Sequence, residues 1–343
     1  MKLELVLLLV LAFSTSEAFV LNCKFAVAAT LLRDYKAYSC ISRDSIAADD
    51  TTIERVNGEH LESRNNADVK SIDIRFTETL PTDLSRTFVN LESIRLSGTL
   101  NVIKVTKSSF EGLKKLKRAE IKTNSLPGDI FDNHLGMEEL ILDLHTIDIS
   151  RNPLGKLRKL KKIEIVVDDN SLITKELFEN NLNLEKIDLT SNNLRTIAVD
   201  FFEELTKLEE IDLSFNELIT LEPMLFNNNV KLREIDLTNN NLTFLDVNLF
   251  ASNFNLKSIW IRQNKIKTLD GHLFKYNTLL ETIILDDNEI TSIGTELLTF
   301  LAVENLQRID FQDNICVSDN WNGEEHLFVQ FKTMLIENCG NKI

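Results

Sequence analysis

The chain has 343 residues, a formal net charge of -15 at pH 7 and 43% hydrophobic residues. So acidic a surface repels phosphate groups, which disfavours nucleic acids and anionic membranes as partners. Length alone suggests two or three domains, but a repeated motif predicts one solenoid in which each unit contacts only its neighbours.

Residues 1–18 have the pattern of a secretory signal peptide. Lys2 precedes an apolar run from Leu5 to Phe13, and the small residues of Ser16-Glu17-Ala18 suit cleavage before Phe19. A buried N-terminal helix or a membrane anchor is the alternative, but the run is too short to span a bilayer. No later stretch is apolar for long enough to cross one. We therefore expect a secreted, extracellular protein without membrane insertion.

Four cysteines occur as two local pairs, Cys23 with Cys40 and Cys316 with Cys339. An oxidising compartment would convert them to disulfides. Three pairings are possible, but the ends of an extended stack are far apart, which leaves only the two local bridges. The same separation argues against a zinc site built from all four thiolates. We expect one bridge in an N-terminal cap, residues 19–68, and one in a C-terminal cap, residues 315–343.

The pattern Leu-x-x-Ile-x-Leu-x-x-Asn-x-Leu returns every 24 residues in the second half of the chain. Clear copies begin at Leu184, Leu208, Leu232, Leu256, Leu280 and Leu306. Weaker copies begin at Val69, Leu91, Leu116, Met137 and Leu160, giving about eleven repeats over residues 69–314. A fixed period of this length predicts a solenoid with one short parallel strand per repeat.

Two further columns recur in register with the strands. An apolar residue six places before a strand segment predicts a stacked core, and the column comprises Phe110, Phe131, Leu154, Phe178, Phe202, Phe226, Phe250, Phe274 and Phe300. An amide at the ninth position of a copy can satisfy backbone groups in the turn after the strand. This ladder comprises Asn124, Asn192, Asn216, Asn240, Asn264, Asn288 and Asn314.

After the last repeat, residues Glu324 to Glu337 predict a short amphipathic helix. Leu327, Phe328, Phe331 and Leu335 share one helical face, which we expect to cover the last repeat.

The repeats resemble those of the leucine-rich repeat family, in its typical 24-residue extracellular class. The resemblance implies an α/β solenoid, a horseshoe with a parallel β-sheet on its concave face and disulfide-stapled caps. The class is similar to Toll-like receptor ectodomains, and the segment from Cys23 to Val69 resembles secreted insect leucine-rich repeat proteins, including immune ones. The chain differs in having two cysteines in each cap where many relatives have four.

An enzymatic function is not indicated. The five histidines are scattered, with no repeated offset to a serine, cysteine or acid. No phosphate-binding glycine loop or metal motif occurs, so we expect no catalytic residue, no metal and no cofactor.

A long concave sheet instead offers a binding surface. We predict a partner-binding site at residues between the inward-facing apolar positions of the strands, namely Trp260, Ile284, Phe215, Arg262, Asp236, Asp212 and Asp188. An exposed Trp beside an aliphatic residue and polar groups has the composition of an interface hot spot. The alternative is a Trp covered by its neighbours. The aspartates favour a basic partner, but they can equally be ordinary solvated residues of such repeats.

A second apolar group, Ile141, Leu144, Val166 and Val167, is expected at solvent-facing positions, as an interface or as the sign of a misplaced register. Asn241-Leu242-Thr243 is the only standard glycosylation sequon, and its position past the strand makes modification of Asn241 sterically feasible.

The sequence thus predicts a secreted, non-catalytic protein that binds an extracellular protein, by resemblance in innate immunity or receptor modulation. The alternative is a structural or cell-adhesion component of the extracellular matrix. The ligand and the oligomeric state are left open.

Overall fold

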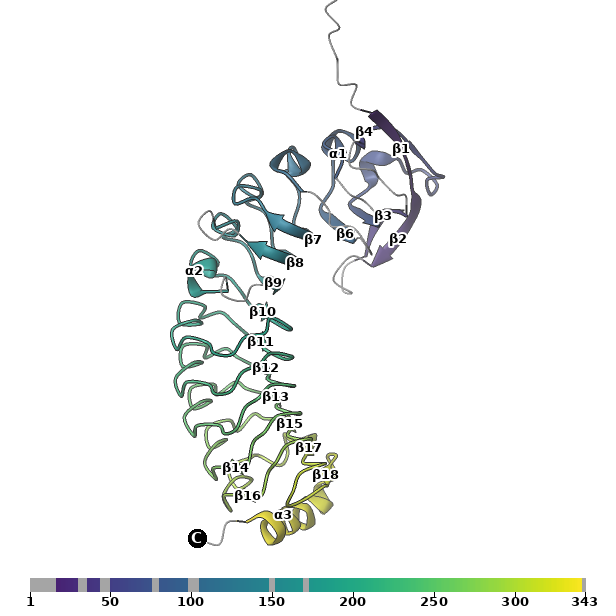
Figure 1. The fold of residues 1–343 in the computed structure, drawn as a ribbon. Coiled ribbons are helices and arrows are strands. Elements are labelled where there is room, and N and C mark those ends of the chain that lie inside the picture. The colour runs from purple at the N-terminus through teal and green to yellow at the C-terminus, as the bar shows by residue number, and fades with distance from the viewer. Residues whose placement is uncertain are drawn as a thin grey trace, which may run out of the picture.

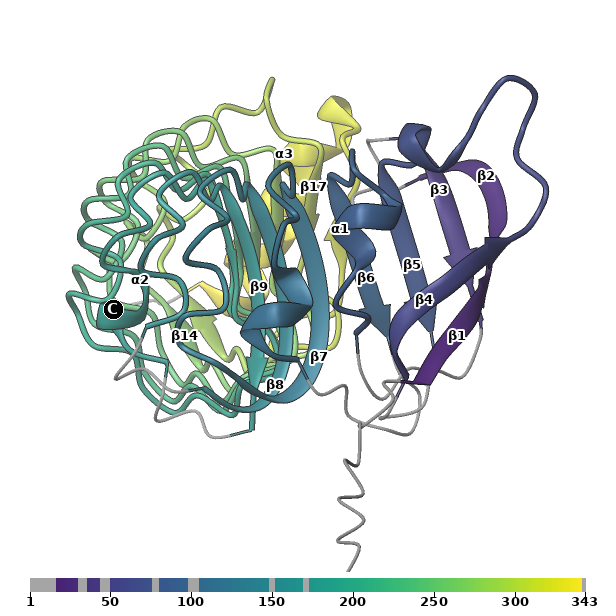
Figure 2. The same cartoon turned by 90° about the horizontal axis from the view of Figure 1, so that it is seen from above.

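The computed structural model describes residues 17–29, 36–43, 50–75, 80–97, 105–147, 152–168 and 173–340. These residues form a curved solenoid with strands along its inner side and turns and loops along its outer side (Figure 1). Seen from above, the strands stack behind one another along the curve (Figure 2). The predicted signal peptide lies outside the described residues except for Glu17 and Ala18. Among the described residues, no helix has the length and apolarity required to cross a bilayer.

The repeats contribute a parallel sheet on the concave side. Its strands are β5 (Ser71–Arg75), β6 (Ser93–Ser97), β7 (Arg118–Leu126), β8 (Glu139–Ile147), β9 (Lys162–Val167), β10 (Lys186–Asp188), β11 (Glu210–Asp212), β12 (Glu234–Asp236), β13 (Ser258–Trp260), β15 (Thr282–Ile284) and β17 (Arg308–Asp310). Each strand begins two residues after a predicted repeat start. The repeat positions read from the sequence are therefore confirmed, including those of the weak copies.

Each end of this sheet is extended by strands of other geometry. At the N-terminal end, β3 (Lys36–Ser42) pairs parallel to β5, and β2 (Lys24–Ala29) pairs antiparallel to β3. At the C-terminal end, β18 (Asn320–Trp321) pairs antiparallel to β17. These antiparallel strands cover edges that would otherwise expose unpaired backbone groups.

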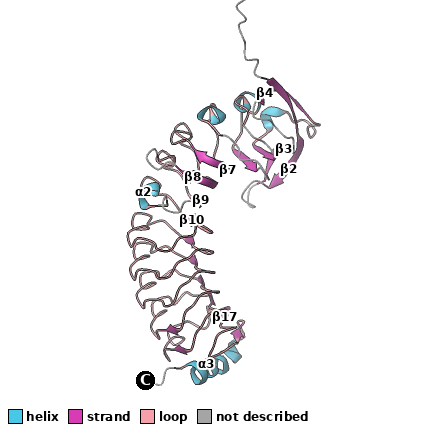
Figure 3. Ribbon diagram, in the orientation of Figure 1, coloured by secondary structure: helices cyan, strands magenta, loops and turns pink. Residues whose placement is uncertain are grey.

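The remaining elements are short and lie outside this sheet. Two small sheets pair β1 (Glu17–Asn22) with β4 (Asp50–Asn57) and β14 (Thr268–Leu269) with β16 (Ser292–Ile293). The outer side is mostly loop with a few helical turns (Figure 3). These turns are η1 (Asn66–Asp68), α1 (Leu84–Thr87), η2 (Lys107–Phe110) and α2 (Lys175–Phe178), and the longer α3 (Glu325–Cys339) follows the last repeat.

The predicted aromatic column forms the centre of the core. Its members from Phe110 to Phe274 are at most 1% exposed. Successive rings pack closely, with centroids 5.7 Å apart between Phe202 and Phe226 and 6.3 Å apart between Phe226 and Phe250. Phe300 is the exception, because the last repeat is longer. It is only partly buried and packs against the ring of His272, with centroids 5.5 Å apart.

The amide ladder is confirmed from Asn192 onward. The Asn240 amide nitrogen donates to the carbonyl oxygens of Leu213 and Leu237, at 2.9 and 3.0 Å, and its oxygen accepts from the Leu218 backbone nitrogen at 3.0 Å. Each such side chain therefore joins its own turn to the repeats before it. Asn124 does not belong to the ladder, since its side chain is exposed.

Backbone conformation at the eighth position explains this difference. In the regular repeats this residue is left-handed, as at Ser191 (φ 60°), Phe215 (φ 55°) and Asn239 (φ 54°). That conformation ends the strand and turns the ninth side chain inward. β7 instead continues for nine residues, and the alternation from Arg118 onward buries Thr123 and exposes Asn124.

A second asparagine ladder was missed by the sequence reasoning. It lies three places before each strand segment and comprises the fully buried Asn181, Asn229, Asn253 and Asn277. The Asn253 nitrogen donates to the carbonyl oxygens of Phe226 and Asn229, both at 3.0 Å. His134 occupies the same position in an earlier repeat, and its Nε2 lies 3.0 Å from the Phe110 carbonyl oxygen. The sequence contained a signal for this ladder, because an asparagine recurs three places before the strand segment in four of the repeats.

Both predicted disulfides are present. Cys23 is joined to Cys40 and Cys316 to Cys339, with Cα atoms 5.1 and 5.3 Å apart. The second bridge fixes the end of α3 against the last repeat.

The predicted C-terminal helix is α3, which buries Phe328, Phe331 and Leu335. The ring of Phe328 packs on Trp321, with centroids 5.2 Å apart. Leu327 is 39% exposed, so its assignment to the covered face was wrong.

Candidate functional site

The predicted site residues lie on the concave face at equivalent positions of neighbouring strands. Asp188 pairs in register with Asp212, Asp212 with Asp236, Asp236 with Trp260, and Trp260 with Ile284. Adjacent strands of a sheet are about 4.8 Å apart. These side chains therefore form one continuous row across β10 to β15.

The three aspartates have a local structural role. Each carboxylate accepts a hydrogen bond from the backbone nitrogen two residues on, at 3.0 Å from Thr190 for Asp188 and at 2.8 Å from Thr238 for Asp236. Asp212 does the same with Ser214 at 2.9 Å. An Asx turn of this kind satisfies the donor exposed where the short strand ends. Aspartate at this position thus serves the fold whether or not it also contacts a partner.

The row is also electrostatically unfavourable in isolation. Burial raises the pKa of Asp188 and of Asp236, and the charge of the intervening Asp212 raises both further. Burial likewise raises the pKa of Glu164 on β9, with Asp188 as the next contribution. A cation brought to this row would relieve the repulsion.

Trp260 is partly exposed on the concave face, between Asp236 and Ile284. Its indole N–H donates no hydrogen bond to another described residue. Ile284 is only 6% exposed, so the expected exposed Trp–Ile pair is absent. Because Ile284 packs into the sheet, Trp260 is the only accessible apolar residue of the two.

Phe215 is 52% exposed and lies where β11 ends. Its left-handed backbone conformation, with φ 55°, is uncommon for a large aromatic residue. Among the described aromatic contacts, none joins its ring to Trp260. Phe215 is therefore an exposed residue of the turn after β11, and no described contact brings it to Trp260.

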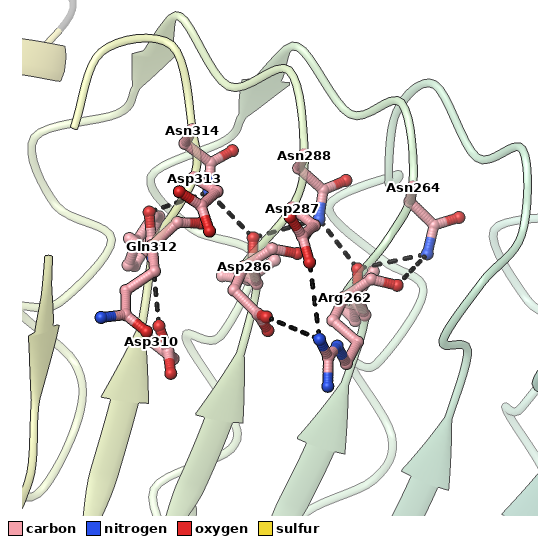
Figure 4. A network of polar contacts seen from close by, with 12 residues as sticks. Arg262, Asn264, Asp286, Asp287, Asn288, Asp310, Gln312, Asp313 and Asn314 are labelled. Atoms are coloured by element: carbon pink, nitrogen blue, oxygen red, sulfur yellow. Dashed lines mark hydrogen bonds and ion pairs between the residues drawn. The ribbon is translucent and has the colours of Figure 1, made fainter. Parts of the chain in front are cut away.

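Arg262, two residues after Trp260 in the chain, is held by two acids (Figure 4). Its Nη2 lies 3.3 Å from a carboxylate oxygen of Asp286 and 3.4 Å from one of Asp287. Burial raises the pKa of Asp286, and Arg262 opposes that shift. The amides of Asn264 and Asn288 hold the turns behind this cluster. Arg262 is thus a partly neutralised cation whose position is set by Asp286 and Asp287.

The second predicted apolar group is divided by the sheet. Ile141 and Val166 are partly exposed on the concave face, whereas Leu144 and Val167 are each 1% exposed. The expectation of four solvent-facing residues was wrong for the latter two. β8 and β9 continue as regular strands through these positions, and period-two alternation directs Leu144 and Val167 into the core.

Asn241 is partly exposed on the turn after β12, and the following Leu242 is fully buried. The Asn241 backbone nitrogen donates to the Leu218 carbonyl oxygen at 2.8 Å, which fixes the backbone of the turn. This geometry is compatible with a glycan, and modification stays a prediction.

The described residues contain no group of three or more His, Cys, Asp or Glu side chains arranged to hold a metal ion. His145 is paired with Asp168 on the surface, and His134 is buried in the core.

Comparison with known proteins gives consistent results. The family profile described as "Leucine rich repeat" matches residues 158–218, 182–242 and 230–290. A search of curated protein sequences finds no significant match.

Among solved structures, a chain of the glycosylated Toll–Spatzle complex from Drosophila is 20% identical, with a TM-score of 0.60 over 80% of this chain and 43% of that chain. A chain of the complex of TLR13 with ssRNA13 is 20% identical, with a TM-score of 0.60 over 79% of this chain and 40% of that one. The APL1 leucine-rich repeat domain is 16% identical, with a TM-score of 0.57 over 86% of this chain and 77% of that one.

The chain spans less than half of the matched Toll chain, and at these identities the likeness concerns the fold. The matched profile, the repeat spacing and the parallel solenoid together show that this chain contains leucine-rich repeats.

Proposed function

We propose that this is a secreted, non-catalytic leucine-rich repeat protein that binds another extracellular protein through its concave face. The proposed protein has an N-terminal cap of residues 19–68, repeats of residues 69–314 and a C-terminal cap of residues 315–343. The observation that carries the proposal is the partly exposed Trp260, whose indole N–H has no partner among the described residues and which follows the acidic row on the next strand. Aromatic and arginine side chains of this kind dominate the energetics of protein interfaces.

An extracellular location is supported by the two disulfides, which form and persist in oxidising compartments. A role in innate immunity or receptor modulation is supported by the likeness to Toll in its complex with Spatzle. The partner differs among similar folds, since TLR13 is bound to ssRNA13 in its structure. For this chain the row Asp188, Asp212 and Asp236 favours a protein, because carboxylates repel a phosphate backbone.

The test is affinity capture from extracellular fluid with the immobilised mature protein, identification of the captured protein by mass spectrometry, and calorimetry with that purified protein. We expect Trp260→Ala to weaken binding by about 2 kcal/mol or more, which is roughly 30-fold in Kd. Phe254→Ala is the matched control, because Phe254 is 54% exposed but precedes β13 outside the strand face.

An unchanged Kd for Trp260→Ala would remove this residue from the interface. Failure to capture any soluble protein, together with retention of the molecule in an insoluble matrix fraction, would contradict the proposal and favour a structural role in the matrix.

A further inference from the structure

A hollow on the concave face lies away from Trp260, across strands β7 to β10. Its cavity volume is about 60 Å³, or about 420 Å³ when the open solvent at its mouth is counted. Ile141, Glu164 and Asp188 line one side of it, and Arg118, Lys162 and Lys186 line the other. Residues at two equivalent positions of neighbouring strands thus form a shallow depression that the end of an apolar side chain can enter.

The wall of this hollow is largely hydrocarbon although most of its residues are charged. Arg118 forms an ion pair with Glu139 on the neighbouring strand, with Nε and Oε2 3.0 Å apart. Lys186 forms one with Glu210, with Nζ and Oε2 2.8 Å apart. Their aliphatic stems therefore face the hollow. Ile141 supplies the apolar centre, because the residues paired with it on the neighbouring strands are Glu120 and Glu164.

The acids beside the hollow differ from those earlier in the same row. Arg95 lies 2.7 Å from Glu120 and 4.0 Å from Asp73, so a cation within the chain neutralises that end. From Glu164 through Asp188 and Asp212 to Asp236, no described ion pair involves any of the four carboxylates. The hollow therefore opens onto a run of negative charge about 14 Å long, taking 4.8 Å between strands.

We propose that the hollow is a docking site for a protein segment that inserts the end of one apolar side chain beside Ile141 and lays basic side chains along Glu164, Asp188, Asp212 and Asp236. An extended segment advances about 3.3 Å per residue, so roughly five residues cover the acidic run. This inference rests on the proposed function and adds the chemistry of the partner. It places the apolar anchor at a site separate from Trp260.

The test uses the mature full-length protein and synthetic hexapeptides, with binding measured by calorimetry at low ionic strength. The probe is acetyl-Phe-Lys-Ser-Lys-Ser-Lys-amide. One control peptide replaces the phenylalanine by alanine, and another replaces the lysines by glutamates. We expect the probe to bind at least tenfold more tightly than either control.

Two variants locate the binding on the protein. Ile141→Gln replaces the apolar centre of the hollow with a polar side chain of similar length and adds no charge to the row, so the fold should be retained. Glu164→Lys reverses one charge of the row. Each should weaken binding of the probe tenfold or more. Glu222→Lys, an equal charge change at an exposed position outside the strand face, should leave binding unchanged.

Equal binding of the phenylalanine and alanine peptides would overturn the proposal, because the hollow would then contribute nothing. Absence of binding by every peptide would overturn it as well. Neither result would touch the proposed function if Trp260→Ala still reduced binding of the captured partner. A loss of binding in Glu222→Lys equal to that in Glu164→Lys would show nonspecific charge attraction and would also contradict the docking site.

Discussion

Replacing Asn240 with alanine removes an amide that joins consecutive repeats. Its nitrogen donates to the carbonyl oxygens of Leu213 and Leu237, and its oxygen accepts from the Leu218 backbone nitrogen, all within 3.0 Å. Leu218 is fully buried, so water does not take the place of the lost acceptor. We expect this substitution to be among the most destabilising in the repeats.

The magnitude follows from counting the groups left without partners. The Leu213 carbonyl retains the amide of Asn216 at 3.0 Å, and the Leu237 carbonyl retains that of Asn264 at 2.9 Å. Only the Leu218 N–H is orphaned, at about 1–3 kcal/mol, since the Thr238 carbonyl, a third and longer contact of the amide at 3.3 Å, keeps the Phe215 backbone nitrogen. The hydrogen bonds to the Leu213 and Leu237 carbonyls add about 0.5–1.5 kcal/mol each. The expected loss of unfolding free energy is therefore roughly 2–6 kcal/mol.

Asn124→Ala is the matched control, because the repeat pattern assigns it to the same position while the structure exposes its side chain. We expect a change within about 0.5 kcal/mol. Urea denaturation followed by circular dichroism gives the free energies, and hydrogen exchange at Leu218 shows whether the loss is local, which matters in a repeat array. Equal destabilisation by the two substitutions would refute the distinction drawn here.

Three further predictions follow from the ladders, the acidic row and the caps. Asn253→Leu should change unfolding free energy by no more than about 1 kcal/mol, because burial of the leucine side chain, as at Leu205 in the equivalent position, offsets the two lost hydrogen bonds. The Asn253 oxygen meets no donor among the described residues and the two carbonyls keep other partners, so the substitution orphans no group; urea denaturation checks this. Asp188→Asn should raise Tm at pH 7, since the raised pKa of Asp188 means that its ionised form destabilises the native state, while an amide oxygen still accepts from Thr190. That benefit should fade as the pH falls towards about 4, where aspartates become protonated in both states, and Tm across this range is the measurement. Cys316→Ser should cost about 2–4 kcal/mol and increase hydrogen exchange in α3 before other elements.

Each of these predictions has an outcome that contradicts it. If Asn253→Leu lowered the free energy of unfolding as much as Asn240→Ala, the second ladder would stabilise the fold as much as the first. The quantity compared is the Tm of Asp188→Asn minus the Tm of the unchanged protein. A smaller difference at pH 7 than at pH 4 would contradict the inferred sign. Uniform loosening of every repeat in Cys316→Ser would show that the bridge does not act locally.

The sequence by itself determined the repeat. Positions that recur every 24 residues, such as Leu208, Ile211 and Leu213, face inward in every regular copy because each repeat must bury the same side against its neighbour. Local cysteine pairs and the aromatic column followed from the same stacking. Even the weak copies were placed correctly, since apolar alternation survives where the asparagine is lost.

Only the tertiary structure decided where each strand ends, and with it the direction of the following side chains. In the regular repeats a left-handed residue such as Phe215 stops the strand and turns Asn216 inward. β8 instead runs nine residues, so Leu144 is buried and His145 is exposed. Strand length depends on pairing with neighbouring strands, which a linear pattern does not contain.

The concave surface shows the same division. The row containing Asp188 and Trp260 could be read from spacing, because parallel strands in register place equivalent residues side by side. The burial of Ile284, the ion pair that draws the head group of Arg118 aside and the hollow around Ile141 could not. They depend on how neighbouring side chains pack across the sheet, and that packing exists only once the repeats are stacked.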